Sequence, residues 1–257
     1  MDTLTQFQPA NIFIAGANRG IGLGFVKALL KQHPTSRIYA TYRNLDAAGE
    51  LMALAVAQPE TLFPLPLDIT DEAQVMECLE RVRSHVDDRL HLALNCIGIL
   101  HAGALQPEKS LKQIDPQHLQ HYFQINSTGA VLLAKHLLPL FRHRDRSIFA
   151  TISAKIGSIG DNQLGGWYGY RASKAALNML IRTAAIEYRR KSPHTLVVML
   201  HPGTTDTDLS KPFQRNVMPE QLFPVERTVA QLLAVLDNLQ EADSGHFFSW
   251  DGSRLPW

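Results

Sequence analysis

The chain has 257 residues, of which 45% are hydrophobic and 19% are charged, an ordinary globular balance. Its formal net charge of +1 offers no basis for binding nucleic acid or an anionic membrane, and no apolar run is long enough to span a bilayer. Two cysteines and an N-terminus without an apolar signal-peptide core point away from a disulfide scaffold and toward a cytoplasmic location. We expect residues 1–257 to form one domain.

Short apolar runs alternate with longer stretches of helical periodicity along the whole chain. The runs predict strands at Ile12–Ala15, Ile38–Thr41, Leu62–Leu67, Leu90–Cys96, Ser147–Ile152, Leu196–Leu200 and His246–Phe248. The periodic stretches predict helices at Ile21–Gln32, Asp46–Gln58, Asp71–Val86, Pro116–Phe141, Tyr170–Lys191 and Pro224–Leu239. This alternation predicts a single-domain, doubly wound α/β Rossmann fold, with a parallel seven-stranded sheet and helices on both faces.

Two stretches, Gly98–Leu111 and Pro202–Phe223, show no regular periodicity. Each follows a predicted strand and therefore lies at the carboxyl edge of the sheet, where open α/β folds bind their ligands. We interpret both as substrate loops.

The first predicted strand runs into the segment Ala15-Gly16-Ala17-Asn18-Arg19-Gly20-Ile21-Gly22, which opens a helix. Free backbone N–H groups and the helix dipole make such a corner a diphosphate site. The glycine pattern alone fits an ordinary loop equally well, but the flanking strand and helix favour a nucleotide. We predict cofactor contacts from Gly16, Asn18, Arg19, Gly20, Ile21 and Gly22.

Tyr170 is the only one of the six tyrosines with a lysine, Lys174, four residues further on within a helical pattern. This spacing places both side chains on one helix face. A cation beside a phenol favours the phenolate and lowers the tyrosine pKa, which suits a general acid/base. The plainer alternative is an exposed tyrosine beside a solvated lysine.

The order of features along the whole chain resembles the short-chain dehydrogenase/reductase family. The glycine turn is followed by Asn95-Cys96-Ile97-Gly98, Asn126, Ser153 and the Tyr170/Lys174 pair, while residues 170–178 and 251–257 resemble the C-factor-like group. The resemblance implies that Tyr170 donates a proton to a carbonyl oxygen. It implies that Lys174 binds the nicotinamide ribose and lowers the Tyr170 pKa, that Ser153 orients the carbonyl, and that Asn126 holds a relay water.

The resemblance also implies further cofactor contacts, from Asp68, Ile69, Asn95, Gly98, Pro202, Gly203 and Thr204. Asp68 has an alternative role as the N-cap of the next helix. Ser158 stands closer to Tyr170 in sequence than Ser153 does. We prefer Ser153, because a strand end holds a hydroxyl more rigidly than a glycine-bearing loop, and Ser158 stays the alternative.

The chain departs from the family pattern in two of these segments. Ala15 replaces the usual threonine before the first glycine, and Asn95-Cys96-Ile97-Gly98 replaces Asn-Ala-Gly. We therefore expect a side-chain hydrogen bond between the two segments to be lost.

The second predicted strand ends Ala40-Thr41-Tyr42-Arg43, without the acidic residue that typically holds the ribose of NAD. Arg43 and Arg19 offer two cations for a 2′-phosphate, although each also fits a solvated surface arginine. We therefore expect NADP(H) in preference to NAD(H), with Thr41 and Arg43 among the contacts. His118 and His121 lack a third ligand nearby, so no metal is expected.

These features predict an NADP(H)-dependent oxidoreductase that interconverts a small-molecule aldehyde or ketone and its alcohol. The alternative is a dinucleotide-binding, C-factor-like signalling or regulatory protein with little turnover. A Rossmann-like methyltransferase leaves Tyr170 and Lys174 without a role. By resemblance we also expect a homodimer or homotetramer, with the helices at Pro116–Phe141 and Tyr170–Lys191 at an interface.

Overall fold

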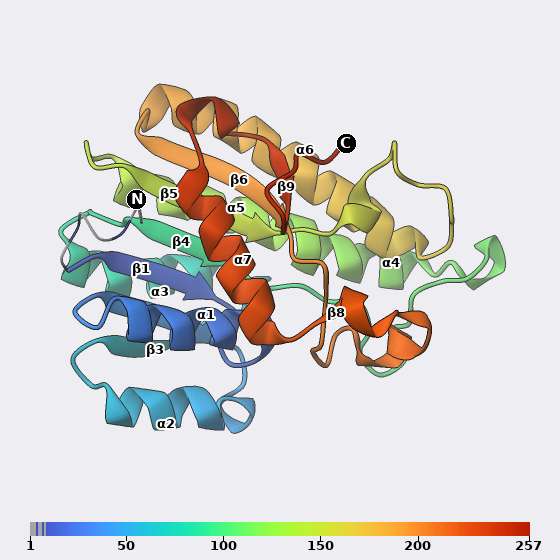
Figure 1. Ribbon diagram of the computed structural model, residues 1–257, viewed down its shortest axis with the longest axis horizontal. Coiled ribbons are helices and arrows are strands. Elements are labelled where there is room, and N and C mark those ends of the chain that lie inside the picture. Colours follow the sequence, from blue (N-terminus) through green and yellow to red (C-terminus); the bar gives the residue numbers. More distant parts are fainter. Residues whose placement is uncertain (1–3, 5–6, 8) are drawn as a thin grey trace.

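The centre of the protein is a seven-stranded sheet, seen in a computed structural model that describes residues 4, 7 and 9–257 (Figure 1). The strands are β1 (Asn11–Ala15), β2 (Arg37–Tyr42), β3 (Leu62–Pro66), β4 (Leu92–Asn95), β5 (Ser147–Ile152), β6 (Thr195–His201) and β9 (Phe247–Ser249). Their order is β3-β2-β1-β4-β5-β6-β9 and every pairing is parallel, so all carboxyl ends share one edge. The predicted doubly wound fold is confirmed.

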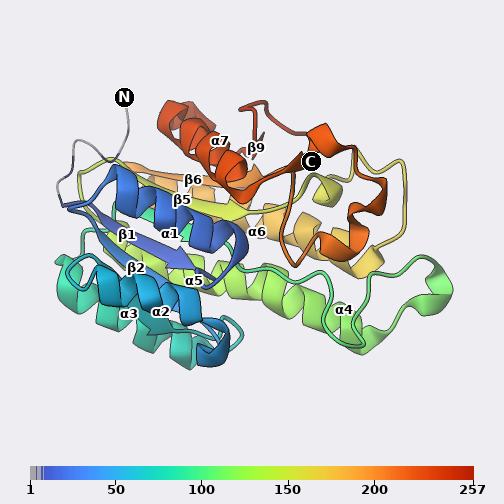
Figure 2. The ribbon, with the colours of Figure 1, turned by 60° about the horizontal axis from the view of Figure 1, so that its bottom comes forward.

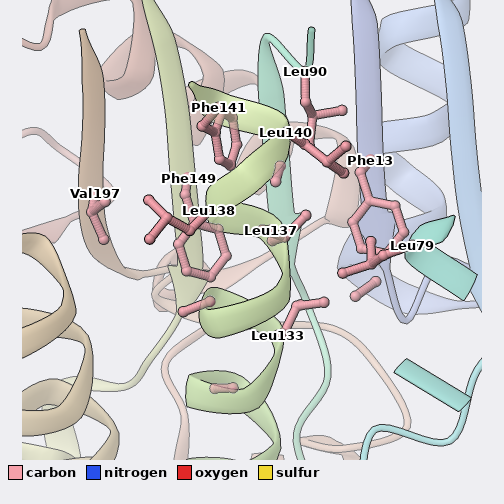
Figure 3. Close-up of a cluster of buried hydrophobic side chains, with 14 of the residues drawn as sticks. Phe13, Leu79, Leu90, Leu133, Leu137, Leu138, Leu140, Phe141, Phe149 and Val197 are labelled. Atoms are coloured by element: carbon pink, nitrogen blue, oxygen red, sulfur yellow. The ribbon is translucent and has the colours of Figure 1, made fainter. Parts of the chain in front are cut away.

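Helices cover both faces of this sheet (Figure 2). One face packs against α1 (Gly20–Gln32), α2 (Gly49–Ala57) and α7 (Val225–Asn238), and the other against α3 (Glu72–Val86), α5 (Gly129–Leu137) and α6 (Tyr168–Lys191). Successive residues of a strand point to opposite faces, so Phe13 joins the core beneath α3 and α5 while Ile12 and Ile14 join the core beneath α1 and α7. Figure 3 shows Phe13 in the first of these cores, with residues of α5 and β5.

The predicted helix at Pro116–Phe141 is composite. It consists of α4 (Pro116–Phe123), a π-helical turn at Gln124–Thr128, α5, and a 3₁₀ turn at Leu138–Phe141. A π turn is a single widened turn within a helix, and five residues are too few for the apolar periodicity to distinguish it from α-helix. Such turns are frequent at functional sites, and this one has Asn126 at its centre.

The predicted helix at Asp46–Gln58 begins later than expected, at Gly49. The Asn44 side chain accepts a hydrogen bond from the backbone N–H of Asp46 and caps a separate 3₁₀ turn at Leu45–Ala47. Local side-chain capping therefore diverts this segment from the helix.

The two aperiodic stretches contain short regular pieces. Between residues 202 and 223, β7 (Thr204–Thr205) pairs in parallel with β8 (Leu222–Phe223), and 3₁₀ turns lie between them. Two-residue strands are too short to show alternation. None of the helices in the described part of the chain combines the length and hydropathy that a bilayer span requires.

Candidate active site

The segments that follow β1, β4, β5 and β6 gather beyond the carboxyl edge of the sheet (Figure 1). They comprise the glycine loop at 16–22 and the loops at 96–110, 153–167 and 202–223. The two predicted substrate loops therefore lie at the same edge as the glycine loop.

The glycine loop packs too closely to admit a side chain at Gly16 or Gly22. Gly16 has φ +74°, and a Cβ at Gly22 would lie 2.1 Å from the Gly16 carbonyl oxygen. The first helical turn of α1 contains no acidic residue, and no side chain caps its N-terminus at Arg19. The N–H groups at this helix start remain available to an anion, so the loop fits a diphosphate.

Thr41, at the end of β2, anchors the glycine loop. Its Oγ1 accepts a hydrogen bond from the Gly16 N–H at 3.0 Å, and its carbonyl accepts one from the Ala17 N–H at 2.7 Å. The Asn95 amide instead bonds the Ile97 N–H and the Thr151 hydroxyl, each at 3.1 Å. The position of the glycine loop is thus set from β2.

The two candidate phosphate-binding arginines have different surroundings. Arg19 Nη1 lies 3.3 Å from Asp208 Oδ2, and both side chains are largely exposed. Arg43 is exposed and makes no hydrogen bond or ion pair with another described residue. The segment that carries Asp208 also lies over the glycine loop, because a Cβ at Gly20 would be 3.3 Å from Thr207 Cγ2.

Tyr170 and Lys174 are both buried on α6, with 6% and 3% of their surface exposed. Lys174 Nζ lies 5.9 Å from the centre of the Tyr170 ring and donates a hydrogen bond to the Ile152 carbonyl at 3.0 Å. Burial lowers the pKa of Lys174 to about 8. Burial, together with the neighbouring Tyr122, raises the pKa of Tyr170 above its ordinary value of 10.0.

The expectation that the Tyr170 pKa is lowered is therefore wrong for this structure. Loss of water around the phenol outweighs the lysine, whose ammonium group is directed at the Ile152 carbonyl. Tyr170 is consequently a neutral phenol, able to donate a proton, at neutral pH.

Asn126 joins the loop after β4 to α6. Its Oδ1 accepts a hydrogen bond from the Ile99 N–H at 2.8 Å, and its Nδ2 donates to the Ile99 carbonyl and to Ser173 Oγ, each at 3.0 Å. A Cβ at Gly98 would lie 3.4 Å from Lys174 Nζ and 3.5 Å from Asn126 Oδ1. The structure thus brings Gly98, Asn126 and Lys174 together.

The two candidate serines are both buried. Ser153 is 2% exposed, and its hydroxyl donates to Asn178 Oδ1 at 2.7 Å. Ser158 is 1% exposed, and its Oγ accepts a hydrogen bond from the Asp161 N–H at 3.2 Å. Each side chain therefore has a partner within the protein.

Asp68 does not cap the following helix, as the alternative prediction required. Its Oδ1 accepts hydrogen bonds from the Thr70 N–H at 2.9 Å and the Thr70 hydroxyl at 2.6 Å, whereas Asp71 caps α3. Ile69 is buried against Gly129 in the core. That alternative is wrong, because Asp71 supplies the capping oxygen.

The Pro-Gly turn after β6 is also closely packed. Gly203 has φ +73°, and a Cβ there would lie 2.6 Å from Phe223 Cε2. The Pro202 carbonyl accepts a hydrogen bond from the Thr205 hydroxyl at 3.4 Å, while Thr204 pairs with Leu222 between β7 and β8. The turn is therefore held in place from the far end of the 202–223 loop.

Apolar and aromatic side chains surround Tyr170. The Trp167 and Tyr122 rings each lie 6.3 Å from the Tyr170 ring, and Phe213 lies 4.8 Å from Trp167, measured between ring centres. The same cluster includes Leu100, Leu105 and Leu209, so both predicted substrate loops contribute to it. The surroundings of Tyr170 are thus suited to an apolar molecule.

Glu108, a carboxylate only 2% exposed, belongs to the site region but was not predicted from sequence. Its Oε2 accepts a hydrogen bond from the Gly169 N–H at 3.1 Å, and its backbone carbonyl accepts one from the Trp167 N–H at 2.5 Å. Glu108 therefore ties the loop after β4 to the start of α6. An acidic residue in an aperiodic loop is usually exposed, so no local signal marks it.

Among the residues that the structure describes, no group of three His, Cys, Asp or Glu side chains is placed to hold a metal ion.

Comparison with known proteins gives a consistent set of similarities. The family model for short chain dehydrogenases matches residues 10–217. An uncharacterised oxidoreductase of Schizosaccharomyces pombe is 30% identical over 257 residues, covering 95% of this chain and 97% of its own length. The C-signal protein of Myxococcus xanthus is 32% identical over 148 residues, covering 58% of this chain and 84% of its own. The crystal structure of NADPH-bound carbonyl reductase from chicken fatty liver matches with a TM-score of 0.86 and 32% identity, covering 98% of this chain and 100% of that one.

Proposed function

This chain belongs to the short-chain dehydrogenase family, and on that premise we propose that it is an NADP(H)-dependent oxidoreductase that interconverts an aldehyde or ketone and its alcohol. One observation carries the proposal: Tyr170 is a buried, neutral phenol within an apolar cluster, with Lys174 one helical turn away. We take residues 1–257 as one dinucleotide-binding domain.

The cofactor would bind along the carboxyl edge. When bound, it supplies or accepts the hydride. The start of α1 would hold the diphosphate, and Arg43 with Arg19 the 2′-phosphate. The remaining predicted contacts are Asn18, Ile21, Thr41, Asp68, Ile69, Asn95, Gly98, Pro202, Gly203 and Thr204. Two observations support NADP(H): β2 ends without an acidic residue, and the carbonyl reductase that is 32% identical binds NADPH.

Within this site Tyr170 would donate its proton to the carbonyl oxygen. The phenol is neutral at neutral pH, so its hydroxyl carries the proton that reduction requires. Lys174 would bind the ribose through its buried ammonium group. Asn126 would hold the relay water and so deliver protons toward Lys174.

The Tyr170→Phe variant tests this proposal. Removal of one hydroxyl should lower turnover of a reactive aldehyde or ketone by roughly 10²–10⁴-fold, the usual worth of a general acid. The rise in melting temperature on adding NADPH should persist, because the ring and the helix remain. Unchanged turnover would remove Tyr170 from the mechanism and favour the regulatory alternative.

Cofactor preference has a separate test. At equal concentration, NADPH should raise the melting temperature more than NADH does. Arg43→Asp should reverse this order, because it places a negative charge where the 2′-phosphate binds. Arg144→Asp, an equivalent change at an exposed site before β5, is the matched control and should keep the original order. Equal shifts for both cofactors in the unmodified protein would refute the preference.

A further inference from the structure

We propose that Ala154, and neither Ser153 nor Ser158, is the residue of the segment after β5 that faces the substrate beside Tyr170. This inference rests on the proposed function. It means that no serine hydroxyl of that segment orients the carbonyl, and that an apolar methyl group lines the site there instead.

The Ser153 side chain is directed away from Tyr170. Its Oγ lies 2.7 Å from Asn178, eight residues after Tyr170 on α6, a rise of about 12 Å along the helix. Helical side chains lean toward the helix N-terminus, which carries the long Tyr170 side chain still further from Asn178. Ser153 therefore faces the middle of α6.

The hydroxyl of Ser153 is also already engaged. A serine has a single O–H to donate, and Ser153 donates it to Asn178 Oδ1. Exchanging the nitrogen and oxygen of the Asn178 amide would still leave Oγ at 2.7 Å from that side chain. Ser153 is 2% exposed, and within this buried position its hydroxyl is engaged by α6 through Asn178.

Ser158 belongs to the interior of its loop. Its N–H donates to the Lys155 carbonyl and its Oγ accepts from the Asp161 N–H, so both groups stabilise turns. The preceding Gly157 is pressed against α6, because a Cβ there would lie 2.6 Å from Lys174 Cβ. Ser158 is thus buried in the contact between this loop and the helix.

Ala154 has the opposite orientation to Ser153, as expected for its successor in an extended segment. It is only partly buried, and it packs against the cluster of Leu100, Leu105, Tyr122 and Tyr170. A methyl group at this place donates no hydrogen bond. Orientation of the carbonyl then depends on Tyr170 and on packing against the apolar wall, which makes Ala154 a specificity-determining residue.

Thiol labelling tests the orientation without requiring turnover. Ala154→Cys should react with iodoacetamide at pH 8, whereas Ser153→Cys should react at least about tenfold more slowly because burial raises thiol pKa values. Background reaction should be small, because burial raises the pKa of both native thiols, Cys78 and Cys96, to about 12. Faster labelling at position 153 would overturn the proposal.

Activity measurements test whether a hydroxyl group that would orient the carbonyl is missing at position 154. The kcat/KM of Ala154→Ser should exceed that of Ala154→Cys, a variant of similar size with a weak S–H donor, by about tenfold or more. A ratio near one overturns the proposal. A loss of tenfold or more in the kcat of Ser153→Ala, with an unshifted melting temperature, also overturns the proposal. If position 154 alone is labelled but the unmodified protein and every variant fail to turn over carbonyls with NADPH bound, the orientation stands and the proposed function fails.

Discussion

The glycine loop and the surroundings of Tyr170 lie at the same edge of the sheet but are built in opposite ways. The glycine loop depends on absent side chains: a Cβ at Gly22 would overlap the Gly16 carbonyl. The Tyr170 region depends on large buried and partly buried side chains from three loops and from α4 and α6. Substitutions that add atoms should therefore disrupt the glycine loop. Substitutions that remove atoms or expose buried groups should disrupt the Tyr170 region.

Gly22→Ala should have the largest effect. The added Cβ, 2.1 Å from the Gly16 oxygen, must displace backbone, which we expect to cost about 3 kcal/mol of unfolding free energy and to abolish the NADPH-induced rise in melting temperature. Gly49→Ala is the matched control, because no atom lies within 4 Å of its Cβ. It should change stability by less than about 1 kcal/mol. Similar results for both variants would break the comparison.

The second prediction concerns pH and the buried Lys174. Its pKa is about 8 in the folded protein against 10.5 ordinarily, so the unfolded chain binds this proton more tightly. At about 1.4 kcal/mol per pKa unit, burial of the charged form costs about 3.5 kcal/mol below pH 8. That cost is relieved as the pH rises from about 8 to 10.5.

Lys174→Met should remove this dependence. Urea unfolding at intervals from pH 7 to 10.5 should show the unmodified protein gaining up to about 3 kcal/mol relative to the variant. This gain in unfolding free energy accumulates over the whole pH range, so the change within any one pH interval is smaller than the loss caused by Gly22→Ala. Parallel stability curves would show that Lys174 is not buried as a cation.

Thr41→Val should have the smallest effect. The change keeps the shape of the side chain but leaves the Gly16 N–H without its Oγ1 acceptor, at a cost of about 1 kcal/mol. Because the loop loses one anchor and gains no atoms, NADPH affinity should fall only severalfold by isothermal titration. A loss as large as that of Gly22→Ala would mean that anchoring, and not exclusion of side chains, shapes this loop.

Periodicity was sufficient to predict the sheet and its helices. The strand Ser147–Ile152 was predicted with its observed bounds, because it is short, mostly apolar and rich in β-branched and aromatic residues. The π turn at Gln124–Thr128 was missed, since a single turn of five residues is too short to be recognised from apolar periodicity.

The candidate site could be predicted only in part. The i to i+4 spacing correctly placed Tyr170 and Lys174 on one face of a helix, but it carried no information on burial, which reverses the expected shift of the Tyr170 pKa. The orientation of Ser153 depends on Asn178, 25 residues away, and the burial of Glu108 depends on Gly169, 61 residues away. Contacts over such separations leave no mark on local sequence patterns, and the assigned site roles stay predictions.

The strand order determines when each strand can find its partner during synthesis of the chain. β9 (Phe247–Ser249) pairs with β6, and α7 packs on α1, so both ends of the sequence meet in one core. Parallel pairing has no local hairpin to start from, and contacts between distant residues form slowly. During synthesis, the outer edge of β6 stays unpaired until residues 247–249 have emerged from the ribosome. Over that interval the exposed strand edge is open to pairing with other chains.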